Sequence, residues 1–211
     1  MSAQEQRVRD HLRLALRDEQ RMRLEIYEAI LRKWQRTVNL VGSSTVDRIW
    51  ERHFADSLQL APLAGAWNNW IDIGSGAGFP GLVIALTAAD SGRVVHLVES
   101  DRRKAAFLAE VSRETGASVQ IHVDRIERVV PELISMIRFD IISARALAPL
   151  KVLIGYARPV LLQGGRGLFF KGKELAAELT NLSGRDSVTY ETVTSLTDPA
   201  ARIVIVQSLK S

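Results

Sequence analysis

The sequence predicts an α/β fold, a mostly parallel seven-stranded sheet with an antiparallel hairpin at one edge and a helical extension at the N-terminus. From residue 70 onward, short apolar runs alternate with longer segments of helical periodicity. Strands that are apolar along their length and separated by helices are typical of a parallel sheet covered on both faces. The last two apolar runs, 187–194 and 202–208, are joined by a short link, which indicates an antiparallel pair.

The helical extension is expected over residues 1–65, and the α/β domain over 66–211. Ser2 and Glu5 have the spacing of a capping box, which predicts that a first helix begins there and ends near residue 16. The extension therefore starts with a helix.

Two further helices are expected in the extension. Apolar residues recur at helical spacing over 19–37, so this segment is predicted to bury a broad face, with Trp34 in the core more readily than stacked on a base. After a turn at 41–44, Thr45 is expected to cap a third helix that ends near residue 63.

The sheet takes its other five strands from the alternating region. Strands are expected at 70–73, 93–99, 118–123, 138–143 and 166–171. Helices are expected at 80–89, 101–115, 126–135, 149–162 and 173–183. With the edge pair this gives seven strands.

Composition excludes several kinds of chemistry. The chain of 211 residues has no cysteine, so disulfides, thiolate metal sites and a cysteine nucleophile are absent. Its four histidines are scattered, and no metal site is expected. The N-terminus is charged and the longest apolar run, near 82–89, is too short to span a bilayer. We therefore expect a cytoplasmic protein with no membrane partner, and a monomer because no dedicated dimer surface is evident.

Basic residues gather in one part of the chain. The net charge is +4, and residues 151–173 carry five basic and no acidic side chains. A basic face would suit a polyanion such as RNA. A solvated surface remains an equal interpretation at this point.

A glycine-rich turn follows the first strand of the sheet. Residues 69–81 comprise a short apolar strand, an acidic residue near its end and four glycines, and an apolar helix comes next. Glycine adopts positive φ and lets the backbone approach a ligand closely. Such a turn at a helix N-terminus predicts a nucleotide-sized slot.

The register of the turn distinguishes two cofactors. Residues 76–81 satisfy G-x-G-x-x-G, a dinucleotide pattern that is weak by itself. Counted from the strand end, however, the third glycine position is occupied by Phe79. Asp72 followed by glycines at 74, 76 and 78 resembles instead the first motif of class I S-adenosylmethionine-dependent methyltransferases. Asp72 could also be a turn carboxylate without a ligand.

Glu99 ends the second predicted strand, where a carboxylate can accept both ribose hydroxyls of a nucleoside. This role fits either cofactor. The basic run 102–104 could form a phosphate site for NADP, a solvated helix turn or part of a nucleic-acid surface.

Several motifs together resemble one narrower family. Residues 33–40, 52–57, 72–81, 143–146 and 170–172 are similar to the signatures of the glucose-inhibited division protein B family, the bacterial 16S rRNA methyltransferases G. The similarity covers roughly residues 20–208. It implies a class I (Rossmann-like) methyltransferase fold and methyl transfer from S-adenosylmethionine to N7 of one guanine in the decoding-region loop of 16S rRNA, free or in an assembling small subunit.

The resemblance also implies roles for individual residues. Ile126 and Glu127 would border the adenine, and Arg145 would lie beside the transferred methyl group. The cofactor-binding positions implied overall are Asp72, Gly74, Gly76, Gly78, Phe79, Glu99, Ile126, Glu127 and Arg145. Basic positions at the pocket mouth, candidates for RNA binding, are Arg125, Lys171 and Arg202. The chain reads Ser-Ala-Arg-Ala at 143–146 where the family often has Ser-Arg-Ala, so the alignment of Ser143 stays open.

The chemistry agrees with these residues. Guanine N7 carries a free lone pair and no proton, so its methylation needs neither a general base nor a metal, and catalysis would be mainly positioning. The chain has no Asn-Pro-Pro-Tyr motif for exocyclic amines. Arg145, the one catalytic candidate, is assigned to the cofactor or to phosphate, since the methylated base becomes cationic. His53 and Asp56 share a helical face, and either close over the pocket or form a local hydrogen bond.

Two alternatives remain. An NAD(P)-dependent oxidoreductase would use the same slot, but the chain shows no Tyr-x-x-x-Lys motif. A non-catalytic RNA-binding ribosome assembly factor would retain the fold without turnover.

Overall fold

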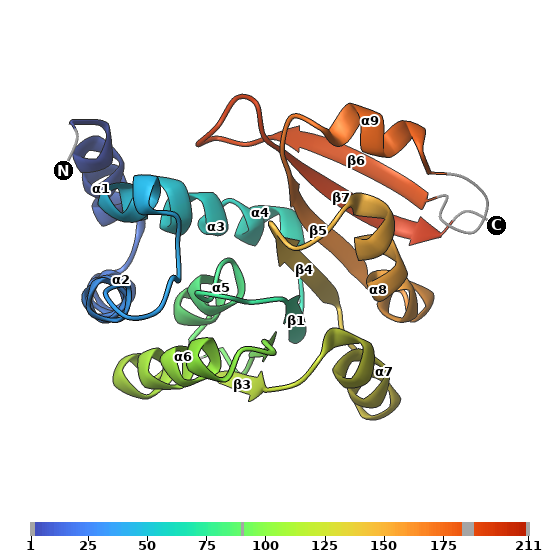
Figure 1. Ribbon diagram of the computed structural model, residues 1–211, viewed down its shortest axis with the longest axis horizontal. Helices are drawn as coiled ribbons and strands as arrows, with labels where there is room; N and C mark the ends of the chain where they lie inside the picture. The colour runs from blue at the N-terminus through green and yellow to red at the C-terminus, as the bar shows by residue number, and fades with distance from the viewer. Residues whose placement is uncertain (1–2, 90, 183–187, 210–211) are drawn as a thin grey trace.

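The computed structural model describes residues 3–89, 91–182 and 188–209. Within these residues, seven strands form one sheet in the order β3-β2-β1-β4-β5-β7-β6 (Figure 1). The strands are β1 (Asn69–Ile73), β2 (Val94–Val98), β3 (Val119–His122), β4 (Ile141–Arg145), β5 (Arg166–Lys171), β6 (Val188–Thr194) and β7 (Arg202–Leu209). The first five strands pair in parallel, and β7 is antiparallel to both β5 and β6. The predicted fold class is confirmed.

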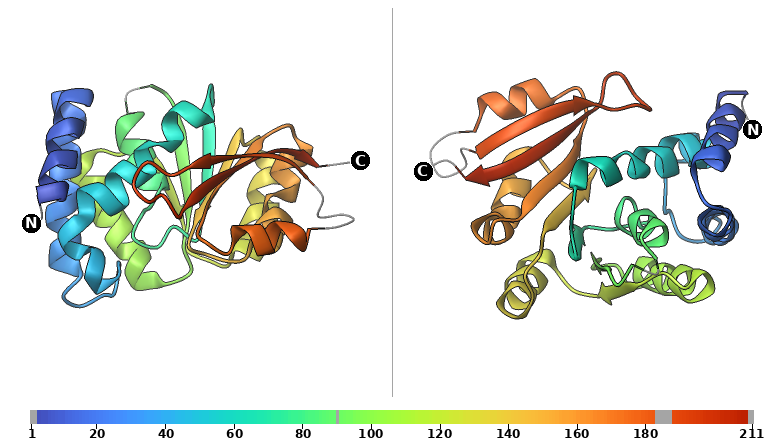
Figure 2. Two further views of the ribbon diagram at one scale, coloured as in Figure 1. Left: turned by 90° about the horizontal axis from the view of Figure 1, so that it is seen from above. Right: turned by 180° about the vertical axis from the view of Figure 1, so that it is seen from behind.

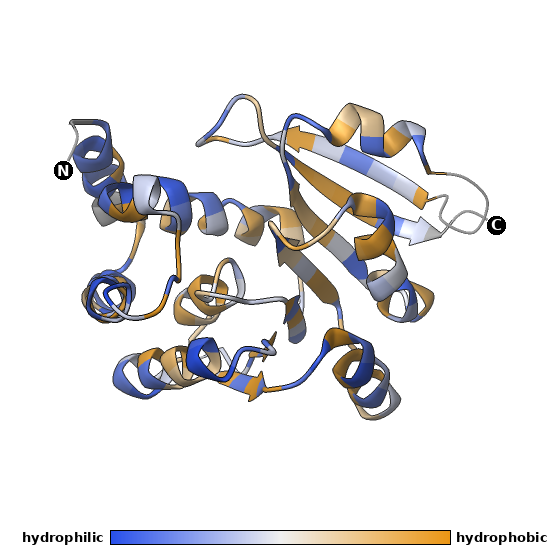
Figure 3. Cartoon of the chain, viewed as in Figure 1, coloured by the Kyte–Doolittle hydropathy of each residue, from blue (hydrophilic) through white to orange (hydrophobic). Residues whose placement is uncertain are grey.

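Helices cover both faces of the sheet. Helices α5 (Gly81–Thr87) and α6 (Arg102–Thr115) lie on one face, and α7 (Ile126–Met136) and α8 (Leu150–Leu162) lie on the other, followed by α9 (Leu175–Thr180). Successive side chains of β5 point to opposite faces of the sheet. Leu168 and Phe170 belong to the hydrophobic cluster on one face, and Phe169 belongs to the cluster on the other. The inner strands β4 and β5 are mostly hydrophobic, whereas the edge strand β6 is mostly hydrophilic (Figure 3).

The N-terminal helices extend the core on the α5–α6 side. Helix α1 (Ala3–Ala15) lies at one end of the molecule and the end of β7 at the other (Figure 2). Tyr27 of α2 (Asp18–Trp34) shares a hydrophobic cluster with Trp50 and with Leu108 of α6. The extension thus packs on the α/β domain through a continuous apolar core, and Trp34 is packed against that core as predicted.

The third predicted helix is confirmed in extent, but it is not a regular α-helix. The chain forms instead a 3₁₀ helix η1 (Ser43–Arg48), a π-helix η2 (Trp50–Ala55), and short α-helices α3 (Asp56–Leu58) and α4 (Leu60–Ala64). The carboxylate of Glu5 accepts the backbone N–H groups of Trp50 and Glu51 at 2.8 and 2.9 Å, so these donors need no partner in the preceding turn. Thr45 does not cap an α-helix, because its hydroxyl donates to the carbonyl of Gly42.

Other element boundaries differ from the predictions by a few residues. Ser2 of the predicted capping box lies outside the described residues, and Glu5 is directed to η2. Helix α2 ends at Trp34, three residues early. Strand β4 begins at Ile141, because Asp140 accepts the backbone N–H groups of residues 68 and 69 with its side chain. Helix α9 ends at Thr180.

Candidate functional site

The glycine turn forms a wall of exposed backbone at the carboxyl end of β1. Gly74, Gly76 and Gly78 all have positive φ, at 67°, 57° and 91°. The nearest atom to a Cβ added at Gly76 would be 3.8 Å away, so one side of this peptide is open. A Cβ at Gly74 would instead lie 2.6 Å from the side chain of Leu147. Glycine is needed at these positions because φ is positive, and at Gly74 also because a side chain would collide with Leu147.

Asp72 supports the turn from beneath. Its buried carboxylate accepts the N–H of Gly81 at 3.2 Å and the hydroxyl of Ser143 at 2.6 Å. The indole of Trp70 donates to the same hydroxyl, which gives Ser143 a definite place below the turn. Burial raises the pKa of Asp72 to about 6. Asp72 was expected among the cofactor-binding residues, but it does not line the cavity described next.

Gly78 also lies away from the cavity. A Cβ at this position would lie 2.6 Å from the hydroxyl of Tyr27 and 2.8 Å from Leu82. The hydroxyl of Tyr27 donates to the carbonyl of Ala77. Gly78 therefore allows α2 to pack against the turn.

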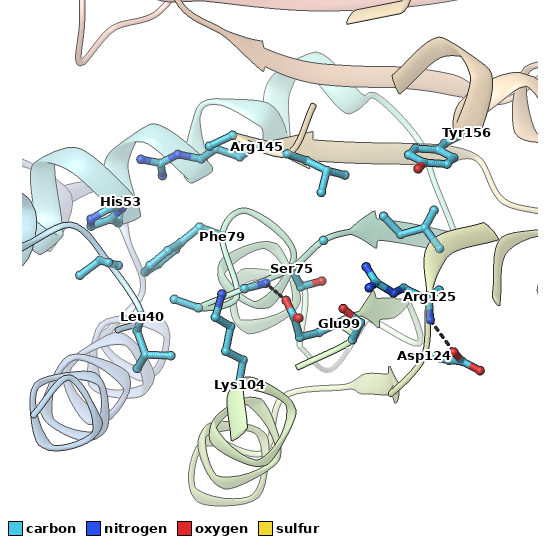
Figure 4. A pocket seen from close by; sticks show the side chains of 18 of the residues that line it. Leu40, His53, Ser75, Phe79, Glu99, Lys104, Asp124, Arg125, Arg145 and Tyr156 are labelled. Atoms are coloured by element: carbon cyan, nitrogen blue, oxygen red, sulfur yellow. Dashed lines mark hydrogen bonds between the residues drawn. The ribbon is translucent and has the colours of Figure 1, made fainter. Parts of the chain in front are cut away.

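A cavity of about 510 Å³ opens beside the turn (Figure 4). This volume lies within the range of small-molecule sites. Of the predicted cofactor-binding residues, the cavity brings together Gly74, Gly76, Phe79, Glu99, Ile126, Glu127 and Arg145. Residues that were not predicted also line it, among them Leu40, Lys104, Asp124, Leu147 and Tyr156.

Glu99 is held across the glycine turn. One carboxylate oxygen accepts the N–H of Gly76 at 2.8 Å (Figure 4). The other accepts the N–H of Asp101 at 2.7 Å. The residue is only 8% exposed. Each carboxylate oxygen has two lone pairs, so both oxygens keep acceptor capacity toward the cavity. A pair of neighbouring hydroxyls is the group that this arrangement fits.

The cavity end next to β3 is built by Arg125, Ile126, Glu127 and Tyr156. The hydroxyl of Tyr156 donates to Glu127 at 2.6 Å. Tyr156 comes from α8, and no local motif announced it, because its place depends on how α8 packs against α7. This end offers an apolar side chain, a tyrosine ring and polar edges, which suits a flat heterocycle.

At the opposite end, His53 lies flat against Phe79, with ring centroids 4.7 Å apart and planes at 15°. His53 Nε2 is 3.0 Å from the hydroxyl of Thr45, and its buried Nδ1 has no hydrogen-bond partner among the described residues. Burial, with the charges of Arg145 and Arg52, lowers the pKa of His53 to about 3. The ring is therefore neutral near pH 7. His53 lines the cavity, as the first of its two interpretations expected.

Arg145 ends β4 and lies at the same end of the cavity (Figure 4). Its Nη2 donates to the carbonyl of Arg52 at 2.7 Å, and its Nη1 lies 3.4 Å from a carboxylate oxygen of Asp56. The guanidinium is 5.9 Å from the centroid of Phe79. Asp56 does not line the cavity, but it accepts a local hydrogen bond from the amide of Gln59 at 2.8 Å, as its second interpretation expected.

The three predicted RNA contacts have different surroundings. Arg125 lines the cavity. Lys171 does not, and its side chain is 9% exposed and paired with Glu178 at 2.7 Å. Arg202 donates to the carbonyls of Pro199 and Ala201. Lys104 also lines the cavity, although it was not among the predicted RNA-binding residues.

The described parts of the chain contain neither a candidate metal site nor a candidate membrane span. No group of three or more His, Asp or Glu side chains could hold a metal ion there. No described helix is long and apolar enough to cross a membrane.

The sheet order, with helices on both faces, is that of the class I methyltransferase fold. An O-methyltransferase from Bacillus cereus, solved in complex with SAH, matches with a TM-score of 0.61 at 14% identity, over 87% of this chain and 91% of that one. The O-methyltransferase TomG from Streptomyces achromogenes, solved in complex with SAM, matches with a TM-score of 0.60 at 17% identity, over 88% and 89%. These similarities support the fold.

The sequence defines the family. The family model for rRNA small subunit methyltransferase G matches residues 20–203. The protein named ribosomal RNA small subunit methyltransferase G of Methylorubrum populi is 47% identical over 187 residues, covering 88% of this chain and 87% of the relative. The protein of the same name from Paramagnetospirillum magneticum is 48% identical over 184 residues, covering 86% and 85%. The chain belongs to the rRNA small subunit methyltransferase G family.

Proposed function

We propose that the chain transfers a methyl group from S-adenosylmethionine to N7 of one guanine in the decoding-region loop of 16S rRNA. The observation that carries the proposal is the cavity beside the glycine turn, in which Glu99 is fixed to Gly76 while His53, Phe79 and Arg145 gather at one end. Family membership supplies the reaction class and the RNA substrate.

The cavity residues fit S-adenosylmethionine. Glu99 would accept the ribose hydroxyls with both oxygens, and Ile126, Glu127 and Tyr156 would border the adenine. The open peptide at Gly76 allows the nucleoside to lie close to the backbone. When bound, the cofactor supplies a methyl group on a sulfonium. The orphaned Nδ1 of His53 and the guanidinium of Arg145 are polar groups available to the ligand or to the base.

The site can perform the transfer without a general base. With S-adenosylmethionine bound, the lone pair of guanine N7 would form the new N–C bond, and the electron pair of the broken C–S bond would remain on sulfur. His53, with its pKa near 3, brings no positive charge toward the base that becomes cationic. The charge of Arg145 is offset by Asp56. Orienting two reactants in this way can contribute about 7–11 kcal/mol to catalysis.

The RNA is expected to present an unpaired guanine. N7 is inaccessible in the deep major groove of A-form RNA but exposed in a loop. Lys104 and Arg125 line the cavity and can contact phosphates, so affinity should fall as salt rises. We further propose that the chain acts as a monomer in the cytoplasm, on free 16S rRNA or on an assembling small subunit.

The two alternatives are tested by the same experiment. The chain is titrated with S-adenosylmethionine and with NADPH, and methyl incorporation into unmethylated small-subunit rRNA is then measured. We expect binding of S-adenosylmethionine and incorporation. Binding of NADPH alone would support an oxidoreductase, and binding of S-adenosylmethionine without incorporation would support an assembly factor; either result contradicts the proposal.

A further inference from the structure

Asp56 lies outside the cavity but holds a residue that lines it. Asp56 is 8% exposed, and its Oδ2 is 3.4 Å from Nη1 of Arg145. In the described part of the chain, this is the one ion pair in which Arg145 takes part. The guanidinium also donates to the carbonyl of Arg52 and lies 5.9 and 5.8 Å from the ring centroids of Phe79 and Phe170. Asp56 is therefore the carboxylate that balances the charge of Arg145.

The second carboxylate oxygen of Asp56 holds the β6–β7 turn (residues 195–201). Oδ1 accepts the hydroxyl of Thr197 at 2.7 Å, the hydroxyl of Ser195 at 3.1 Å and the amide of Gln59 at 2.8 Å. The turn lies at the cavity edge of the sheet, because Arg202 pairs with the last residue of β5. One carboxylate thus joins this turn to the cavity wall.

The position of Asp56 is fixed on both sides. It follows the π-helix that carries Arg52 and His53, so one short segment supplies the carbonyl, the carboxylate and the neutral ring that surround Arg145. The ring of Phe79 lies near both side chains, with its centroid 4.7 Å from that of His53 and 5.9 Å from the guanidinium of Arg145. Arg145 consequently has little freedom to turn away from the cavity.

We propose that Asp56 is a positioning residue of the methyl transfer: it fixes Arg145 at the cavity wall and cancels its charge where the sulfonium binds. The inference rests on the proposed function for its ligand. A sulfonium is a cation, and an uncompensated guanidinium in the wall of the same cavity would repel it. The methylated guanine would be repelled in the same way.

The test compares a charged and an uncharged ligand in Asp56→Asn. S-adenosylmethionine carries the sulfonium, and S-adenosylhomocysteine carries a neutral thioether in its place. Calorimetry should show that the substitution lowers the affinity for S-adenosylmethionine by about tenfold more than the affinity for S-adenosylhomocysteine. Equal weakening of both ligands would reduce Asp56 to a structural support and overturn the proposal.

Two further variants keep the result interpretable. Asp198→Asn removes a carboxylate from the same turn. Asp198 pairs with Arg52 at 3.2 Å and forms no ion pair with Arg145, so the ratio of the two affinities in this variant should equal that of the wild type. If Asp56→Asn does not fold, Arg145→Met tests the same proposal in the opposite direction. Removing the cation should raise the affinity for S-adenosylmethionine relative to that for S-adenosylhomocysteine. An unchanged ratio of the two affinities would contradict the proposal.

Positioning is tested by a double-mutant cycle on kcat. Asp56→Asn should lower kcat by about tenfold in the wild type and by less than about twofold in Arg145→Met, because the residue acts through Arg145. An equal loss in both backgrounds would contradict that route. If the wild type binds both ligands but methylates no rRNA, the proposed function fails, while the ligand ratio still tests Asp56.

Discussion

Glu99 accepts the backbone N–H of Gly76 at 2.8 Å and so bridges β2 to the glycine turn of β1. The second oxygen is fixed by Asp101. A side chain ordered before the ligand arrives loses little conformational freedom on binding. This pair therefore fixes, in the free protein, the part of the cavity where we propose that the nucleoside binds.

Glu99→Gln should lose affinity for S-adenosylmethionine. The amide group replaces one acceptor with a donor and removes the charge, which costs about 1.5–3 kcal/mol for a hydrogen bond to a charged group. Calorimetry should show a weakening of roughly 10- to 100-fold. Glu114→Gln, at a half-exposed residue paired with Arg113, is the matched control and should bind normally. An unchanged Kd in Glu99→Gln would show that Glu99 does not bind S-adenosylmethionine.

Asp72→Asn should keep the affinity for S-adenosylmethionine within about threefold, because the residue lies beneath the turn and outside the cavity lining. An asparagine can still accept from Gly81 and contact Ser143. A loss as large as that of Glu99→Gln would instead place Asp72 in contact with the ligand.

The same variant should change stability with pH. The folded pKa of Asp72 is raised to about 6 from 3.8, so the protonated acid favours the folded state below pH 3.8, and this contribution is lost as the pH rises through 6. Asp72→Asn should therefore gain stability relative to the wild type between pH 4 and 7.5, by up to about 3 kcal/mol. Urea unfolding at both pH values measures this, and an identical pH dependence of both proteins would contradict it.

His53→Phe should weaken the dependence of stability on acid. The folded pKa of His53 is lowered to about 3 from 6.5, so its contribution is complete above pH 6.5 and is lost as the pH falls toward 3. The wild type should lose about 2 kcal/mol more than the variant between pH 7 and 5. His96, with a pKa lowered to about 4, acts in the same direction in both proteins and cancels. Parallel pH curves would show that His53 is not buried as a neutral ring.

Gly81→Ala should destabilise the protein, whereas Gly155→Ala should stabilise it. A Cβ at Gly81 would lie 2.6 Å from both Asp72 and Leu97, which we expect to cost about 1–3 kcal/mol. At Gly155, inside α8, no atom lies within 4 Å of the added Cβ, and the gain should be about 0.4–1 kcal/mol. Denaturant unfolding compares them, and equal effects would contradict the close packing of α5 on β1.

Local patterns account for the parts of the site that could be predicted. The strand, turn and helix around Gly74 and Gly76 follow one another in the chain, and β5 was predicted with its observed bounds. Glu99 directly follows β2, so its position beside the turn follows from the register of β1 and β2.

Contacts between distant segments account for what was missed. Tyr156 reaches the cavity only because α8 packs beside α7. The π-helix depends on Glu5, 45 residues before Trp50, and no periodicity within 45–63 contains that information. Lys171 looked available for RNA, but Glu178 on α9 pairs with it.

The identity of the methylated nucleoside is the most direct check on the proposed reaction. Unmethylated small-subunit rRNA is incubated with the chain and S-adenosylmethionine, digested to nucleosides and analysed by mass spectrometry, with Glu99→Gln as the impaired control. We predict 7-methylguanosine as the new product, formed by the wild type and strongly reduced in Glu99→Gln. A methyl group on another atom or base, or no methylated product, would contradict the proposed function.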